Sequence, residues 1–280
     1  MRKPKVLIAG CGDVGTALGL LLIDQGYEVY GLRRTINQLP DSIHAIKGDL
    51  IDKSSLSALA DLPMLDYLVY SAAGGGRGAA AYQGTYIDGF SNVMQSLTHA
   101  PKHTFFTSST SVYGQSNGEW VDETSPTEPN SETGKIMVAA EQQVLTQRNS
   151  TVVRFSGIYG PGRDHLIRTV QEGIIAPPEP VHYSNRIHRD DCAGVLAHLI
   201  GLVEQGQAIE PIYLASDDAP TPIHEVMKWL AQKRGIEIKG YKEIRRGGSK
   251  RCRNEKLKRL SYQLKAPSFV DGYVEPQSHR

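Results

Sequence analysis

Residues 5–34 read KVLIAGCGDVGTALGLLLIDQGYEVYGLRR, and this stretch decides the fold. A short apolar run at residues 5–9 is followed at once by the turn GCGDVG, and residues 13–25 then carry apolar side chains at helical spacing. Gly26 suits the C-terminal cap of that helix, and residues 27–32 are typical of a second strand. The stretch therefore predicts a strand, a glycine-rich turn, a helix and another strand.

The turn has the pattern G-x-G-x-x-G, formed by Gly10, Gly12 and Gly15. Between a strand and a helix, this pattern is typical of dinucleotide binding. Gly10 permits the tight turn, Gly12 lets a pyrophosphate approach the backbone, and Gly15 lets the helix pack closely on the strand. The helix N-terminus offers unpaired N–H groups to the anion, so Asp13 and Val14 are also expected at the cofactor. A glycine turn without a ligand is the alternative.

The end of the second strand discriminates between the two nicotinamide cofactors. An NAD site usually has Asp or Glu there, to accept a hydrogen bond from the ribose 2′-hydroxyl. This chain has Arg33 and Arg34 instead, and guanidinium groups can bind a 2′-phosphate. We therefore expect NADP, with NAD as the alternative if both arginines point to solvent.

Three further residues are predicted at the cofactor. Asp49, in the sequence KGDL, is placed to reach the adenine amino group, or else it caps a helix near Ser54. Ala72 and Ala73 follow the strand-like run at residues 67–71, at the same expected edge of the sheet.

The rest of the chain alternates strand-like and helical segments, which predicts an α/β fold with a doubly wound parallel sheet covered on both faces. Pro-rich breaks at residues 176–181 and 217–222 mark excursions from that sheet. We expect a dinucleotide-binding domain at 1–160, completed by about 187–216, and a small substrate lobe from 161–186 and 217–280. The further strands are expected at 43–47, 67–71, 104–108, 151–155 and 211–215, and the helices at 86–99, 134–147 and 191–204.

Composition is that of an ordinary soluble globular protein, with 40% hydrophobic and 22% charged residues in 280. There is no apolar run long enough to span a membrane, and the short apolar stretch behind the basic N-terminus does not favour a signal peptide. The three cysteines, Cys11, Cys192 and Cys252, lie far apart and show neither metal-ligand nor disulfide spacing. We therefore expect a cytoplasmic protein without a metal site.

The net charge of +1 is unevenly spread, because residues 231–265 hold 13 Lys or Arg against 3 Asp or Glu. This excess indicates a solvated basic face or a site that attracts an anionic substrate. Nucleic acid is not expected as a partner, because the chain has no recognisable nucleic-acid-reading motif.

Several later segments resemble the extended short-chain dehydrogenase/reductases, the sugar-nucleotide epimerase and dehydratase group. The resemblance covers nearly the whole chain and implies a Rossmann-type sheet, a small C-terminal substrate lobe and NAD(P)-dependent chemistry. The matching segments are SSTSVYG (108–114), VDETSP (121–126), PNSETGKIMVAAE (129–141), RFSGIYGPGR (154–163), RIHRDDCAGVL (186–196) and IYLASDDAPTPIHEVMKWLA (212–231).

The resemblance also implies catalysis by a Tyr, a Lys four residues later, and an upstream Ser or Thr. Ser109 matches the upstream position. The register fixed by Glu141 places Thr133 at the Tyr position and Met137 at the Lys position. In this family the Lys lowers the pKa of the Tyr phenol toward working pH, so losing both removes the usual proton shuttle. Lys135 lies two residues too early to take over, and the active site is therefore predicted to be atypical.

Other residues could supply the proton. Tyr113 and Tyr159 are the remaining phenols near the expected nicotinamide end, although Tyr113, Tyr159 and Ser109 could also be satisfied structural groups. His188 is a further candidate, or a packed structural histidine. Arg186 is expected in the substrate cleft, and Asp191 is expected to cap a helix.

Only about 22 residues separate GPGR from RIHRDD, which makes a large sugar nucleotide doubtful. We therefore expect an NADP-dependent oxidoreductase or epimerase-like enzyme for a small or modest-sized polar substrate, either neutral or anionic. An inactive dinucleotide-binding sensor or regulator is the alternative, and a partner-binding protein using the basic segment is a third reading. The resemblance also implies a homodimer through helices 86–99 and 134–147.

Overall fold

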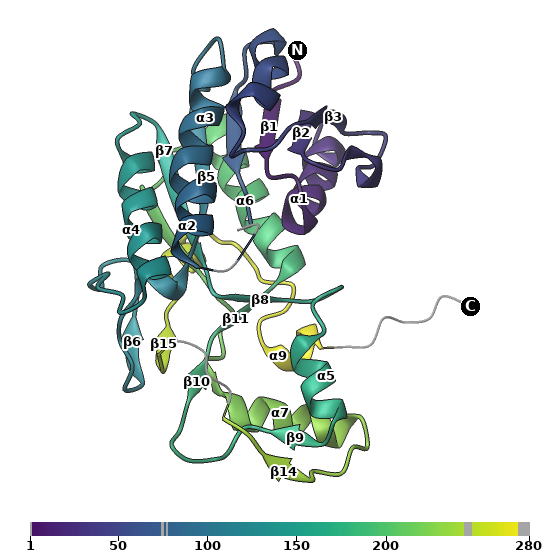
Figure 1. Ribbon diagram of the computed structural model, residues 1–280, viewed down its shortest axis with the longest axis vertical. Coiled ribbons are helices and arrows are strands. Elements are labelled where there is room, and N and C mark those ends of the chain that lie inside the picture. Colours follow the sequence, from purple (N-terminus) through teal and green to yellow (C-terminus); the bar gives the residue numbers. More distant parts are fainter. Residues whose placement is uncertain (1, 74–75, 77, 244–247, 274–280) are drawn as a thin grey trace.

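Seven parallel strands form the central sheet of the computed structural model, which describes residues 2–73, 76, 78–243 and 248–273 (Figure 1). They are β1 (Lys5–Ala9), β2 (Glu28–Arg33), β3 (His44–Lys47), β4 (Tyr67–Tyr70), β5 (His103–Ser109), β7 (Ser150–Phe155) and β12 (Ile212–Ala215). Their spatial order is β12-β7-β5-β4-β1-β2-β3, so the winding reverses between β1 and β4. Ligands of open α/β sheets bind at the carboxyl ends of the strands beside such a reversal.

Helices cover both faces of the sheet, which confirms the predicted fold class. Alternate residues of β1 show why: Val6 and Ile8 pack against one helical layer, and Leu7 and Ala9 pack against the other. The first layer is α1 (Asp13–Asp24) and α6 (Arg189–Glu204). The second is the 3-10 helix η2 (Lys53–Asp61), α2 (Ala79–Tyr82), the π-helical turn η3 (Gln83–Asp88), α3 (Gly89–Ser96) and α4 (Glu132–Leu145).

A smaller lobe lies below the sheet domain in Figure 1 and has an apolar core of its own. Val170, Val226 and Met227 are fully buried in that core. The lobe contains α5 (His165–Gln171), β9 (Ile174–Ile175), α7 (Ile223–Lys233), β14 (Gly240–Tyr241) and α9 (Phe269–Gly272). The short paired strands β8 (Gly157–Tyr159) and β11 (Arg186–His188) lie between the lobe and the sheet domain (Figure 1). A second short pair joins β10 (Tyr183–Ser184) to β13 (Thr221–Pro222).

After α7 and β14 the chain returns to the sheet domain. There β15 (Lys250–Cys252) pairs in parallel with β6 (Glu119–Val121), and α8 (Glu255–Arg259) follows. Leu257 is buried in the same core as α1 and α6. This return brings Lys250 to the segment that follows β5, which contains the 3-10 helix η4 (Thr110–Val112). Another short 3-10 helix, η1 (Ile36–Gln38), follows β2.

Two capping predictions are wrong. Asp191 does not cap α6, because it lies inside the first turn and its carboxylate accepts hydrogen bonds from the main-chain N–H groups of Lys265 and Ala266. The cap is His188, whose Nδ1 accepts from the amide of Asp190. The reason is tertiary: Asp191 is fully buried and satisfies the backbone of the returning C-terminal segment.

The cap of η2 is likewise not Asp49. Asp52 accepts from the amide of Ser54 at 3.0 Å, because it stands directly before the helix. The helix predicted at 86–99 also differs, since helical structure begins at Ala79 and ends at Ser96. The alanines at 79–81 favour helix, but Gly84 interrupts the helical pattern. A prediction based on apolar spacing therefore starts this helix too late. None of the helices in the described part of the chain has the length and apolar character needed to cross a bilayer.

Candidate functional site

The glycine-rich turn leaves main-chain atoms open at the N-terminus of α1. Gly10 has a φ of +86°, and a Cβ there would lie 2.7 Å from the main chain of Ala72. A Cβ on Gly15 would lie 2.9 Å from Ile8, so close helix–strand packing requires glycine. A Cβ on Gly12 would meet nothing nearer than 3.9 Å, so the space beside this backbone is free. The amides of Gly10, Cys11 and Gly12 donate to main-chain oxygens. The geometry therefore fits a pyrophosphate beside Gly12, resting against the N–H groups of the first turn of α1.

Asp13, the first residue of α1, is held by two arginines from distant segments. Arg163 Nε lies 2.9 Å from Asp13 Oδ2, and Arg189 Nη1 lies 2.8 Å from Asp13 Oδ1. Arg189 also bonds Asp190 at 2.6 Å. A lone carboxylate would repel a pyrophosphate at this helix end, and the two guanidinium groups offset its charge. Sequence reasoning missed both arginines, because they lie 150 and 176 positions from Asp13.

The other predicted cofactor residues meet along the carboxyl edge of the sheet. Arg33 ends β2, is partly buried, and donates to Gln38 Oε1 at 2.7 Å, whereas Arg34 is exposed. Asp49 is partly buried beyond the end of β3, and its carboxylate accepts from the amide of Ile51 at 3.3 Å. Beyond β4, Ala72 is buried against Gly10, and Ala73 is exposed.

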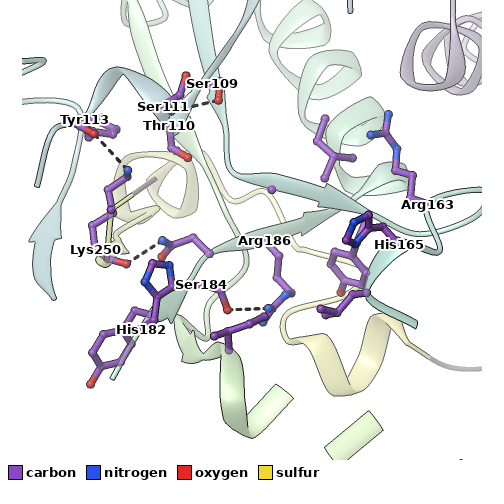
Figure 2. Close-up of a pocket in the computed structure, with 18 of the residues that line it drawn as sticks. Ser109, Thr110, Ser111, Tyr113, Arg163, His165, His182, Ser184, Arg186 and Lys250 are labelled. Atoms are coloured by element: carbon purple, nitrogen blue, oxygen red, sulfur yellow. Dashed lines mark hydrogen bonds between the residues drawn. The ribbon is translucent and has the colours of Figure 1, made fainter. Parts of the chain in front are cut away.

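A cavity of about 860 Å³ lies between the sheet domain and the lobe (Figure 2). Hydroxyl-bearing residues from the end of β5 form one wall, and basic residues from the lobe side form another. Of the predicted catalytic and substrate residues, Ser109, Tyr113, Thr133, Tyr159 and Arg186 line this cavity.

Ser109 presents a hydroxyl group that can donate a hydrogen bond into the cavity. Its Oγ accepts from the amide of Ser111 at 3.1 Å and so caps η4. Among the described residues its own proton has no acceptor. Thr133 lies in the first turn of α4, with its Oγ1 3.4 Å from Ser131 Oγ. Met137, at the family's Lys position, is buried in the sheet-domain core, whereas Lys135 is exposed.

The two candidate phenols are engaged elsewhere. Tyr113 donates to the main-chain oxygen of Asp122 at 2.7 Å and accepts from Arg154 at 3.0 Å. Burial raises the pKa of Tyr113, although the Arg154 guanidinium opposes this. Tyr159 donates to the main-chain oxygen of Ser268 at 3.3 Å, and burial raises its pKa too. Both hydroxyl groups are therefore poorly disposed to exchange protons near neutral pH.

Glu141, which fixes the register of the family motif, has a structural role here. Arg154 Nη2 lies 2.7 Å from Glu141 Oε2, and Arg154 Nε lies 3.0 Å from Oε1. Ser108 donates to the same carboxylate at 2.5 Å. The pair is buried and joins α4 to β7 behind the cavity.

His188 and Arg186 lie on β11 but have different surroundings. Besides capping α6, the His188 ring packs edge-on against Tyr159, with centroids 5.3 Å apart, and it is not among the residues that line the cavity. Arg186 is buried, donates to Ser184 Oγ at 2.7 Å, and lies over the ring of Phe269. Arg186 is therefore the better placed of the two for a ligand.

Lys250 also lines the cavity, and sequence reasoning missed it. The sequence shows it only as one of many basic residues in the C-terminal segment. Its Nζ donates to the main-chain oxygen of Tyr113, 137 positions away, so no local pattern could have singled it out.

Known proteins share this architecture. Residues 6–210 match the NAD dependent epimerase/dehydratase family. Protein YeeZ of Escherichia coli strain K12 is 29% identical over 208 residues, which cover 70% of this chain and 73% of YeeZ. A solved structure described as an NAD-dependent epimerase/dehydratase from Methylobacillus flagellatus has a TM-score of 0.82 and 38% identity, covering 97% of both chains.

More distant structures share the fold alone. The UDP-glucose 4-epimerase of Thermus thermophilus, solved with NAD, has a TM-score of 0.79 at 19% identity and covers 96% of both chains. With the family match spanning most of the chain, the resemblance inferred from its motifs is confirmed. The chain belongs to the NAD dependent epimerase/dehydratase family.

Proposed function

We propose that the chain is an NADP-dependent oxidoreductase or epimerase-like enzyme that acts on a modest-sized polar substrate in the 860 Å³ cavity. One observation carries this proposal: the open glycine turn and the Ser109 hydroxyl both lie at the carboxyl edge of the same sheet. A dinucleotide on the turn and a substrate oxygen at Ser109 would thus share one site.

The preference for NADP rests on the end of β2. Arg33 is partly buried there, with Arg34 exposed beside it, and the side chain at the β2 terminus is not a carboxylate. A 2′-phosphate is a dianion that guanidinium groups bind through charge-assisted hydrogen bonds. Asp49 lies beyond the next strand, where its carboxylate can accept a hydrogen bond from an adenine amino group.

The chemistry divides between cofactor and protein. The bound nicotinamide supplies the hydride donor or acceptor. Ser109 donates its free proton as a hydrogen bond to the reacting substrate oxygen and stabilises the charge that develops there. Because the hydroxyl groups of Tyr113 and Tyr159 are sealed against main-chain carbonyls, we assign proton exchange to water in the cavity. Positioned acid–base catalysis contributes about 10²–10⁴-fold, so turnover should be slow for the family.

Turnover tests the proposal. Incubation with NADPH and a panel of aldehydes, ketones and quinones should show NADPH oxidation with at least one class. Ser109→Ala should lower kcat/KM about 100-fold, because one hydrogen bond to the developing charge is lost. Ser57→Ala is the matched control, since Ser57 is exposed on η2 and far from the cavity lining. Equal rates for the two variants would contradict the role given to Ser109.

An inactive dinucleotide sensor remains the second candidate. The observation in its favour is that a buried Met137 stands at the family's Lys position and that the two phenols lining the cavity donate to main-chain oxygens, so the family's Tyr–Lys proton shuttle is absent. Tight NADPH binding with no turnover across the whole panel would support the sensor over the enzyme.

A further inference from the structure

The cavity is rich in cationic side chains. Arg168, Arg186 and Lys250 line it together with His182, and Asp164 is the single carboxylate among the described lining residues. Arg163 lines it too, but its charge is offset by Asp13. A cavity with this balance attracts anions.

Lys250 is the most unusual of these cations, because it is buried without a counter-charge. Only 5% of the residue is exposed. Its Nζ donates one hydrogen bond, to the main-chain oxygen of Tyr113 at 3.3 Å. Within the described parts of the chain, no carboxylate lies within ion-pair distance of this ammonium.

Such an arrangement is costly for a ligand-free protein. An ammonium has three donors, and one neutral acceptor leaves two of them unsatisfied. Removing an unpaired charge from water carries a large desolvation penalty. Burial lowers the pKa of Lys250, and burial together with the Lys250 charge lowers the pKa of His182 beside it. An anion bound between these two side chains would reverse both effects.

We propose that Lys250 is the anion-binding residue of the cavity, so that the substrate carries a carboxylate or phosphate group in addition to its reacting carbon. This inference rests on the proposed function and names its substrate class. Figure 2 shows Lys250 next to His182, with Ser109 on a separate element above them. A substrate bound with its anionic group at Lys250 can therefore direct another part of its skeleton toward Ser109.

Anion titration of matched variants tests the proposal. Melting temperature is measured against sulfate or acetate at constant ionic strength, with saturating NADPH so that the cofactor site is filled. Lys250→Met should weaken binding of the preferred anion about 10- to 100-fold, the loss expected for a charged hydrogen bond. Lys228→Met, which removes the same charge from an exposed position on α7, should match the wild type.

The same variants separate ligand binding from a purely structural role. Without anions, Lys250→Met should be as stable as the wild type or more stable, because an unpaired buried charge is removed. Stronger binding of sulfate indicates a phosphate substrate, and stronger binding of acetate indicates a carboxylate. Equal anion responses of Lys250→Met and Lys228→Met would overturn the proposal.

Labelling the wild-type protein gives a test that does not depend on a variant folding. Trace acetic anhydride acetylates neutral lysine amines, and peptide mapping reports each lysine separately. The preferred anion should slow acetylation of Lys250 about tenfold, through the charge it restores, and leave Lys228 unchanged. Unchanged Lys250 labelling with both anions would overturn the proposal.

The proposal can fail separately from the proposed function. NADPH turnover without anion protection of Lys250 would leave the enzyme assignment intact and overturn only the anion site. Protection of Lys250 by an anion, without any NADPH binding, would leave the anion site intact and overturn the enzyme assignment.

Discussion

At the residue scale, Asp217 makes stability depend on pH. It follows β12, is buried, and among the described residues its Oδ2 has no hydrogen-bond partner. Burial raises the pKa of Asp217 to about 8, although the nearby Arg186 charge opposes this. The unfolded chain loses this proton near its ordinary pKa of 3.8, whereas the folded chain keeps it up to about pH 8. Stability from this group therefore falls as pH rises through that window.

Asp217→Asn should remove this dependence, because the amide mimics the protonated carboxyl. The difference in unfolding free energy between variant and wild type should be smallest near pH 4 and should increasingly favour the variant up to about pH 8. Urea denaturation across this range measures it, with Asp61→Asn as the control on an exposed carboxylate. A difference that is constant with pH would show that Asp217 ionises normally in the folded protein.

At the element scale, the buried pair Glu141–Arg154 fastens α4 to β7 and positions Tyr113. Each side chain is 4% exposed, so removing one partner leaves an uncompensated buried charge. Glu141→Ala should destabilise the fold by about 3–5 kcal/mol. Glu132→Ala on the same helix breaks only an exposed pair with Lys135 and should cost at most about 1 kcal/mol.

Denaturant titration of both variants compares these costs. Similar small losses for Glu141→Ala and Glu132→Ala would mean that water reaches the buried pair. Because Arg154 also donates to Tyr113, the Glu141 variant is expected to disturb the cavity wall as well.

The elements themselves were largely predictable, and the reason is local. In β1, β4 and β5 an apolar run ends in glycine or small polar residues, which marks both the strand and its carboxyl edge. The glycine-rich turn at 10–15 then indicates at which edge of the sheet a cofactor would bind. The capping error at Asp191 had a tertiary cause, since its carboxylate accepts hydrogen bonds from backbone more than 70 positions later in the chain.

Residues brought together over long distances could not be predicted. Arg163 and Arg189 reach Asp13, and Lys250 reaches Tyr113, from segments more than 130 positions away in the sequence, which only the tertiary fold brings to the sheet edge. No periodicity or motif in a single sequence records such contacts. The proton shuttle predicted at Tyr113 or Tyr159 is disfavoured because both hydroxyl groups donate to main-chain oxygens, and the acceptor for Tyr159 lies 109 positions away.

At the scale of the whole molecule, the basic C-terminal segment serves more than one purpose. Arg251 and Arg253 lie over the exposed ring of Trp120 at 4.8 Å and 4.9 Å. Lys258 pairs with Asp218 at 3.0 Å. Part of the segment thus packs on the sheet domain, and among its described Lys and Arg residues Lys250 is the one buried at the cavity. The homodimer, the domain boundaries and the cytoplasmic location stay predictions.

We propose that a nicotinamide dinucleotide, NADP in preference to NAD, binds beside the glycine-rich turn, against the N–H groups at the start of α1. Titration with NADPH and with NADH, followed by nicotinamide fluorescence, tests it most directly in the wild type and in Arg33→Ser. We predict tighter binding of NADPH than of NADH in the wild type, by about tenfold or more for a bidentate guanidinium–phosphate contact, and loss of that preference in the variant. Tighter binding of NADH, or no binding of either cofactor, would contradict the account.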